Sequence, residues 1–194
     1  MLAASTISTA RANNVSAPSD HPWRRWQRWE RWLWLAGVVI VLDQISKGMV
    51  LAALRPGDSV YVAPFFNWVL TFNRGAAFSF LSDAGGWQRW FFTVLALGVS
   101  VWIVAMLRRH AGEFRLSLAL TMILGGALGN VIDRIRFGAV VDFVQWHAAG
   151  YAWPAFNVAD SAITLGAVLL AWDQFAAKPP AEDGVKSSPT GGQP

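Results

Sequence analysis

Two short stretches, Val140-Val-Asp-Phe-Val144 and Phe156-Asn-Val-Ala-Asp160, each place a single carboxylate where an apolar segment meets a loop. A carboxylate in or beside hydrocarbon is costly, so it is usually paired, neutralised or functional. Neither Asp142 nor Asp160 has a basic residue one helical turn away in the sequence, which favours a functional role. Two such carboxylates brought together can share one proton and activate a water molecule.

The composition is that of a membrane protein. Hydrophobic residues make up 54% of the 194 residues and charged residues 14%, against about 25% charged in an ordinary soluble protein. The 12 Trp residues suit a membrane interface, and the net charge of +4 is too modest to indicate nucleic-acid binding. Cys is absent and the three His form no ligand motif, so we expect neither a metal nor another cofactor.

Four apolar segments are near the length of about 20 residues that crosses a bilayer as a helix. They cover residues 33–54, 87–107, 116–135 and 154–175. Basic residues cluster before the first segment and between the second and third. The positive-inside rule therefore predicts that both termini are cytoplasmic and that loops 55–86 and 136–153 lie outside.

The ends of the chain differ in composition from this central part. Residues 1–22 and 178–194 are poor in apolar side chains, and we expect a disordered cytoplasmic extension and a disordered cytoplasmic tail. Residues 23–177 are expected to form one domain with four membrane-spanning helices. Its first part, 23–34, alternates Trp and Arg and is interpreted as an interfacial anchor, with nucleic-acid binding as the lesser alternative.

The outer loops contain patterns of regular structure. Residues 60–63, 67–72 and 140–146 are typical of strands, and Gly150 marks a turn after the third of them. Residues 76–81 are expected to form a short interfacial helix. The fold class is therefore a mainly α membrane protein with a small extracytoplasmic β-sheet on the outer membrane surface.

Other polar residues have structural interpretations. Counting from residue 33, Asp43 lies roughly 15 Å into its segment, and Lys47 follows one turn later, so the two can neutralise each other. Asp160, counted from residue 155, lies about 8 Å below the outer surface and is therefore shallower. Asp133, beside Arg134, is expected to have a structural role and to order the outer end of the third segment.

Five motifs then occur in order: Asp43-Gln-Ile-Ser-Lys47, Asn73-Arg-Gly-Ala-Ala-Phe78, Gly125-Gly-Ala-Leu-Gly-Asn130 with Asp133-Arg134, Val141-Asp-Phe143 and Phe156-Asn-Val-Ala-Asp160. Together they resemble the motif blocks of the bacterial lipoprotein signal peptidases (signal peptidase II). Each motif alone is a weak signal, but five in order on four apolar segments are specific. The resemblance covers residues 33–175 and leaves both ends of the chain outside it.

The resemblance implies an intramembrane aspartic endopeptidase of the bacterial inner membrane, with its active site near the outer face. Its expected substrates are prolipoproteins with a diacylglyceryl-modified cysteine, cut on the N-terminal side of that cysteine. Asp142 and Asp160 match the catalytic pair of the family. The expected substrate-binding or supporting residues are Asp43, Lys47, Asn73, Arg74, Asn130, Asp133, Arg134, Asn157 and Ala159. Membrane lipid is an expected partner, and a metal is not needed.

Two other classes of function fit the same composition. In a small proton-coupled transporter or channel, the three aspartates Asp43, Asp142 and Asp160 would relay protons. Against this, the polar residues do not run across the membrane and no half of the chain mirrors the other. A non-enzymatic assembly or chaperone protein would instead use the outer sheet.

Overall fold

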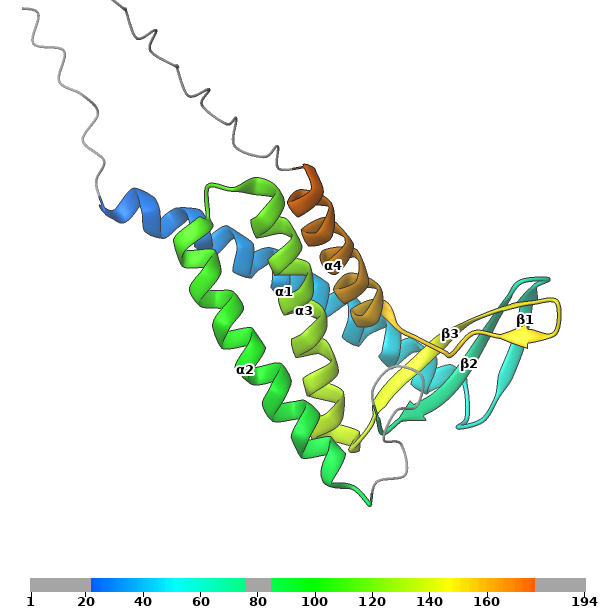
Figure 1. Ribbon diagram of the computed structural model, residues 1–194. Coiled ribbons are helices and arrows are strands. Elements are labelled where there is room, and N and C mark those ends of the chain that lie inside the picture. The colour runs from blue at the N-terminus through cyan, green and yellow to red at the C-terminus, as the bar shows by residue number, and fades with distance from the viewer. Residues whose placement is uncertain (1–21, 76–84, 177–194) are drawn as a thin grey trace, which may run out of the picture.

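A computed structural model describes residues 22–75 and 85–176, which form a helix bundle with a β-sheet at one end (Figure 1). The helices of this part are α1 (Pro22–Ala53), α2 (Trp87–His110), α3 (Phe114–Phe137) and α4 (Val158–Ala176). Its strands are β1 (Ser59–Ala63), β2 (Phe66–Asn73), β3 (Val140–Ala148) and β4 (Tyr151–Ala152). The expected helix at 76–81, the tail, and the N-terminal extension up to residue 21 lie outside the described residues.

All four apolar segments are helical, but their limits differ from those expected. In the described residues, three helices are long and apolar enough to cross a membrane, over Trp29–Ala53, Trp87–His110 and Phe114–Phe137. Helix α4 begins at Val158 rather than near residue 154, because residues 153–156 are held against β3 instead. The fourth span therefore stays a prediction.

Helix α1 is longer than its apolar segment. It begins at Pro22, so the prediction that residue 22 belongs to a disordered extension is wrong. Proline is well tolerated in the first turn of a helix, where its missing N–H would have no partner anyway. The Trp- and Arg-rich run and the first apolar segment are thus one continuous helix of 32 residues.

Helix α3 lies at the centre of the bundle and packs against α1, α2 and α4 (Figure 1). Glycines allow this close approach. A Cβ atom on Gly125 would lie 2.7 Å from the Cβ of Val39 on α1, and one on Gly126 would overlap the carbonyl oxygen of Ala159 on α4. Small residues of this kind let helix backbones meet in membrane bundles, where dispersion contacts replace hydrophobic burial.

The sheet is antiparallel, in the order β1-β2-β3-β4. The three expected strands are confirmed, and Gly150, with φ of 83°, lies in the turn before the short β4. Strand β3 starts three residues after α3, since Gly138 ends that helix in the left-handed conformation (φ 75°) and donates its N–H to the carbonyl of Arg134. This turn carries β3 from the end of the bundle into the sheet.

The chain then returns from the sheet to the bundle beside β3. The backbone N–H of Phe156 donates to the Val144 carbonyl at 3.0 Å, and the Phe156 carbonyl accepts from Phe143 and Val144. The start of α4 is therefore held next to the middle of β3. This is the tertiary contact that brings the two stretches with a single carboxylate together.

The glycine contacts between α3 and α4 give a test of the packing. Gly126→Ala should lower the free energy of unfolding by about 1–3 kcal/mol, because the added methyl group meets rigid backbone rather than a flexible side chain. Thermal unfolding in detergent measures the change. The matched control is Gly98→Ala on α2, where nothing lies within 4 Å of the added methyl group and stability should be equal or higher. Equal stability of both variants would contradict the close α3–α4 contact.

Candidate active site

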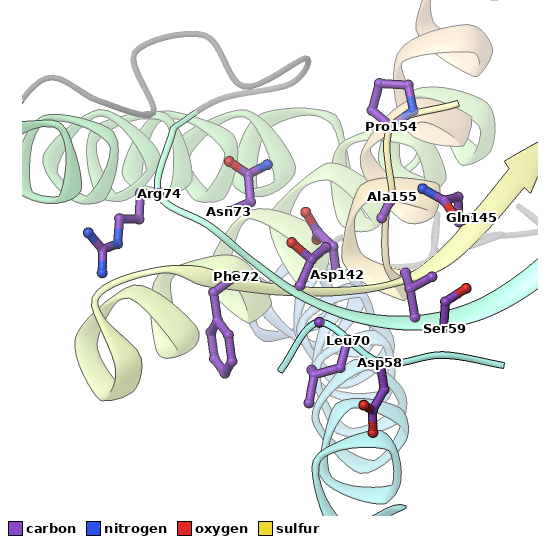
Figure 2. Close-up of a pocket in the computed structure, with 13 residues that line it drawn as sticks. Asp58, Ser59, Leu70, Phe72, Asn73, Arg74, Asp142, Gln145, Pro154 and Ala155 are labelled. Atoms are coloured by element: carbon purple, nitrogen blue, oxygen red, sulfur yellow. The ribbon is translucent and has the colours of Figure 1, made fainter. Parts of the chain in front are cut away.

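Asp142 lies in β3 opposite Thr71 of β2, and its side chain is 1% exposed. Its Oδ1 accepts a hydrogen bond of 2.7 Å from the Asn157 amide, and the side chain of Asn73 forms a second hydrogen bond with it. Figure 2 shows Asn73 and Asp142 directed to the same side of the strands, with Leu70 and Phe72 directed to the other. The strand alternation thus places one amide from β2 beside the carboxylate of β3.

Asp160 lies in the first turn of α4 and is half-buried. Its Oδ1 accepts a hydrogen bond of 2.8 Å from the Asn130 amide of α3. Its backbone N–H donates to Asn157 Oδ1 at 2.9 Å, which is the usual bond between an N-cap side chain and the third residue of a helix. A negative side chain at this position is also favoured by the helix dipole.

Asn157 joins the two carboxylate residues. Its side-chain oxygen caps α4 at Asp160, and its amide nitrogen donates to Asp142 Oδ1 and to the Val141 carbonyl, at 2.7 and 3.2 Å. This side chain is fully buried, so its orientation is fixed. The same asparagine therefore begins α4 and holds Asp142 next to it.

Electrostatics favour a shared proton between these residues, which we call the carboxylate pair. Burial first, and the nearby Asp160 carboxylate second, raise the pKa of Asp142 to about 7. The hydrogen bonds from Asn73 and Asn157 and the charge of Lys47 oppose the rise. Because like charges close together cannot both ionise easily, one member of such a pair keeps a proton at neutral pH.

Below the carboxylate pair, Lys47 lies between two buried carboxylates. Its Nζ is 2.8 Å from Asp43 Oδ2 and 2.7 Å from Asp133 Oδ2, and it donates a third hydrogen bond of 3.1 Å to Asn130 Oδ1. We call Asp43, Lys47 and Asp133 the lysine cluster. Asp133, for which a structural role was expected, faces α1 and binds Lys47.

The lysine cluster touches the backbone of both stretches that hold the carboxylate pair. Asp43 Oδ1 accepts the backbone N–H of Ala159 at 2.9 Å, and Asp133 Oδ2 accepts that of Val141 at 3.1 Å. Asp43 therefore lies directly beside the start of α4, and its depth relative to Asp160 stays a prediction. Counting residues from 33 measured distance along α1, whereas α1 starts earlier and crosses the other helices at an angle (Figure 1).

Gln44 belongs to this arrangement and was missed in the sequence. Its amide nitrogen lies 3.2 Å from Asp43 Oδ2, 2.9 Å from Asp133 Oδ1 and 3.3 Å from the Gly129 carbonyl. It is thus a neutral donor between the two carboxylates that share one lysine. A glutamine inside an apolar segment was a usable signal, since polar groups there need partners.

The two expected arginines have different positions. Arg134 is half-buried, and its guanidinium donates to the carbonyls of Gly75 and Asn130 and lies over the ring of Phe92. Arg74 is exposed and lies at the end of β2, away from the carboxylates (Figure 2). Only Arg134 is therefore packed against the residues that hold the carboxylate pair.

Two cavities open beside the carboxylate pair. One, of about 610 Å³, reaches Asp142 and is lined largely by polar side chains of the sheet and the preceding turn (Figure 2). The other, of about 660 Å³, reaches Asp160 and is lined largely by apolar side chains, among them Trp146, Ile163 and Leu165. We call them the polar cavity and the apolar cavity. Asn73, Pro154 and Ala155 line both, so the cavities are neighbours.

The chemistry available here is that of two carboxylates, buried amides and one guanidinium. No group of three His, Cys, Asp or Glu within residues 22–75 and 85–176 has the arrangement to hold a metal ion. A carboxylate pair with one proton can deprotonate a water molecule and protonate a carbonyl oxygen. The arrangement can therefore hydrolyse an amide bond placed between the two cavities.

Sequence comparison gives one family and consistent relatives. Residues 35–176 match the model of a family described as Signal peptidase (SPase) II. The lipoprotein signal peptidase of Azoarcus sp. (strain BH72) is 54% identical over 145 residues, 75% of this chain and 82% of that protein. That of Cupriavidus taiwanensis is 50% identical over 168 residues, 86% of this chain and 90% of that protein.

The fold is also similar to solved structures. One bacterial membrane enzyme, determined by the in meso method at 2.3 Å resolution, gives a TM-score of 0.68 at 29% identity and covers 84% of this chain and 95% of its own. A second, determined in the same way at 1.9 Å, gives 0.67 at 31% identity, over 77% and 95%. Sequence and structure comparisons thus each cover most of the chain.

The lysine cluster gives a test of stability. Lys47→Met should lower the free energy of unfolding by about 3–5 kcal/mol, because it leaves Asp43 and Asp133 buried without a cation. Adding Asp133→Asn and Asp43→Asn to this variant should recover part of the loss. Chemical or thermal unfolding in detergent measures each step. If Lys47→Met alone is as stable as the wild type, the ion pairs of Lys47 with Asp43 and Asp133 do not form.

Asp142 gives a test of pH dependence. An aspartate has a pKa of about 4 in the unfolded chain, so between pH 4 and about 7 the folded protein binds the extra proton. Stability should therefore fall as the pH rises through this window and level off above it. Asp142→Asn should remove this part of the pH dependence and be equally stable or more stable at pH 8. Unchanged pH dependence of the melting temperature in that variant would contradict the raised pKa.

Proposed function

Because the chain belongs to the signal peptidase II family, we propose that Asp142 and Asp160 are the carboxylates with which it removes the signal peptide from prolipoproteins. Removal of signal peptides from prolipoproteins by an aspartic peptidase is the activity of this family. The observation that carries the proposal for the residues is the double attachment of Asn157, which binds the side chain of Asp142 and the backbone of Asp160.

In the proposed mechanism the two carboxylates have different tasks. The burial of Asp142 and its pKa of about 7 suit it to hold the shared proton and to donate a hydrogen bond to the carbonyl of the bond to be cut. Asp160, half-buried and open to the apolar cavity, would accept a proton from the attacking water. The amides of Asn73 and Asn130 keep both carboxylates oriented.

Arg134 completes the proposed site. Its guanidinium lines the apolar cavity beside Asp160 and is fixed by the carbonyls of Gly75 and Asn130. A positive group held in this way can stabilise the negative charge that develops on the tetrahedral intermediate. Asp43, Lys47, Asp133 and Ala159 support the site through their contacts with its backbone and with Asn130.

The proposed substrate is a prolipoprotein whose cysteine already carries a diacylglyceryl group, cut on the N-terminal side of that cysteine. The apolar lining of the cavity at Asp160 supports this, because acyl chains and the apolar part of a signal peptide both need such a surface. Trp146 and Trp153 lie in the same lining, as expected at the level of lipid headgroups.

We further propose that residues 23–177 form one domain with four spans in the bacterial inner membrane, with both termini in the cytoplasm. The turn between α2 and α3 is flanked by Arg108 and Arg109 in the last turn of α2 and by Arg115 in the first turn of α3, which favours its cytoplasmic location. The sheet and the carboxylate pair lie at the other end of the helices (Figure 1). The active site would then face the outer side, where a lipid-anchored cysteine is within reach.

The alternative of a proton-coupled transporter loses support from the position of Asp43. A relay needs acidic groups spaced across the membrane. Asp43 instead accepts the N–H of Ala159, next to Asp160, and is bound to Lys47. Asp43 and Asp160 are therefore close neighbours and not successive steps of a path across the membrane.

Substitution of either carboxylate tests the proposed function. Asp142→Asn and Asp160→Asn should each lower cleavage of a diacylated prolipoprotein by at least about a thousandfold, because neither amide can exchange the proton. Purified protein in detergent and a gel-based cleavage assay are sufficient.

The matched control for this test is Asp173→Asn, which removes a carboxylate from the far end of the same helix, α4. It should cleave at nearly the wild-type rate. Near-normal turnover by Asp142→Asn or Asp160→Asn would exclude that residue from the catalytic pair. Failure of the wild-type protein to cleave would overturn the function itself.

A further inference from the structure

The two cavities differ in the chemistry of their walls, although they meet at one site. Seven of the 13 residues that line the polar cavity have polar side chains, including Ser59, Thr71 and Gln145. The wall of the apolar cavity beyond Asp160 is made instead of α4 and aromatic side chains such as Trp153 and Phe156. A substrate that reaches both carboxylates must therefore extend from the polar cavity into the apolar cavity.

A prolipoprotein has the same asymmetry on either side of the bond to be cut. The signal peptide and the acyl chains are apolar, whereas the chain that follows the modified cysteine becomes a soluble protein. The apolar parts cannot occupy the polar cavity without leaving hydrocarbon, at about 25 cal/mol for each Å² transferred to water. This asymmetry fixes the direction in which the substrate crosses the site.

We infer that the polar cavity binds the first residues of the mature chain, directly after the modified cysteine, and that Gln145 is a specificity-determining residue there. This inference rests on the proposed function. The cavity volume of about 610 Å³ lies in the range of ordinary ligand sites. It thus has room for a short extended segment of peptide.

Gln145 is suited to this contact by its position and its free amide. It lies on β3, three residues after Asp142, and is half-buried beside Pro154 and Ala155, which line both cavities (Figure 2). Its side chain makes no hydrogen bond with the rest of the chain described here. An amide carries both donors and an acceptor, so it can bind the backbone of any residue without regard to its charge.

The charges at the rim of the polar cavity indicate that the wild-type protein prefers neither acidic nor basic substrate residues there. Asp58 and Arg74 line this cavity with opposite signs, and both side chains are exposed. Their fields oppose each other over the cavity and are screened by salt. We therefore expect the wild-type protein to accept acidic and basic residues after the cysteine about equally, and a charge placed at Gln145 to create a preference.

The test uses the full-length protein and three diacylated prolipoproteins that differ only in the two residues after the cysteine: Lys-Lys, Asp-Asp or Ser-Ser. Gln145→Glu should raise kcat/KM for Lys-Lys relative to Asp-Asp by about three- to tenfold, and Gln145→Lys should reverse this ratio. The ratio is measured within each variant, so it does not depend on how much of that variant folds. High salt should reduce both shifts.

Two controls change the net charge by the same amount at the turn between α2 and α3, at the other end of the helices. Arg115→Gln lowers the net charge by one, as Gln145→Glu does. Glu113→Gln raises the net charge by one, as Gln145→Lys does. Both should leave the Lys-Lys to Asp-Asp ratio at its wild-type value.

The possible outcomes separate this inference from the proposed function. Cleavage by all variants with an unchanged ratio would overturn the role of the polar cavity and leave the function intact. A second pair of substrates carries Lys-Lys or Asp-Asp in the two residues before the cysteine, and a shift of their ratio in the Gln145 variants, rather than of the first ratio, would reverse the direction of the substrate and overturn the inference. If the wild-type protein cleaves none of the three substrates, the proposed function fails and the inference fails with it.

Discussion

The ammonium group of Lys47 is the contact on which the rest of the site depends. It uses its three donors on Asp43, Asp133 and Asn130, and so ties α1 to α3 inside the bundle. The two carboxylates that it neutralises then accept the backbone N–H groups of Val141 and Ala159. Both of these residues are direct neighbours of the carboxylate pair along the chain. One buried cation therefore sets the positions of β3 and α4 relative to each other.

Side-chain amides make the hydrogen bonds to the carboxylate pair itself. Asn73, Asn130 and Asn157 come from β2, α3 and the start of α4, and each forms a hydrogen bond with one or both of Asp142 and Asp160. A neutral donor orients a carboxylate without fully compensating its burial, so the pKa of Asp142 stays near 7. The cation lies one layer away, where it stabilises the fold and leaves the pair able to share a proton. This separation suits a site that must exchange protons with water.

The sheet gives the site a second environment that a helix bundle alone would lack. Strands β2 and β3 bring polar side chains to one side of Asp142, while α4 and the segment that leads into it bring apolar side chains to Asp160. The border between the two lies at Asn73, Pro154 and Ala155. Under the proposed function, a substrate with one apolar and one polar part would meet both environments when the bond to be cut lies between the carboxylates.

The sequence by itself determined the four helices and three of the strands, and it singled out Asp142 and Asp160, which the structure places beside each other. Long apolar runs, alternating strands and lone carboxylates are local signals, since each follows from the cost of exposing or burying particular side chains. Three features could be seen only in the tertiary structure. They are the contacts of Gln44, the binding of Asp133 to Lys47, and the contact of Asp43 with the start of α4. The angle at which α1 crosses α3, and the close approach that Gly125 and Gly126 permit, decide which polar groups meet. Such contacts join residues far apart in the sequence, for example Lys47 with Asp133, 86 positions apart, and Asp43 with Ala159, 116 positions apart. Spacing along one helix cannot predict them, because it reports only which residues share a face and not which face of another helix lies opposite.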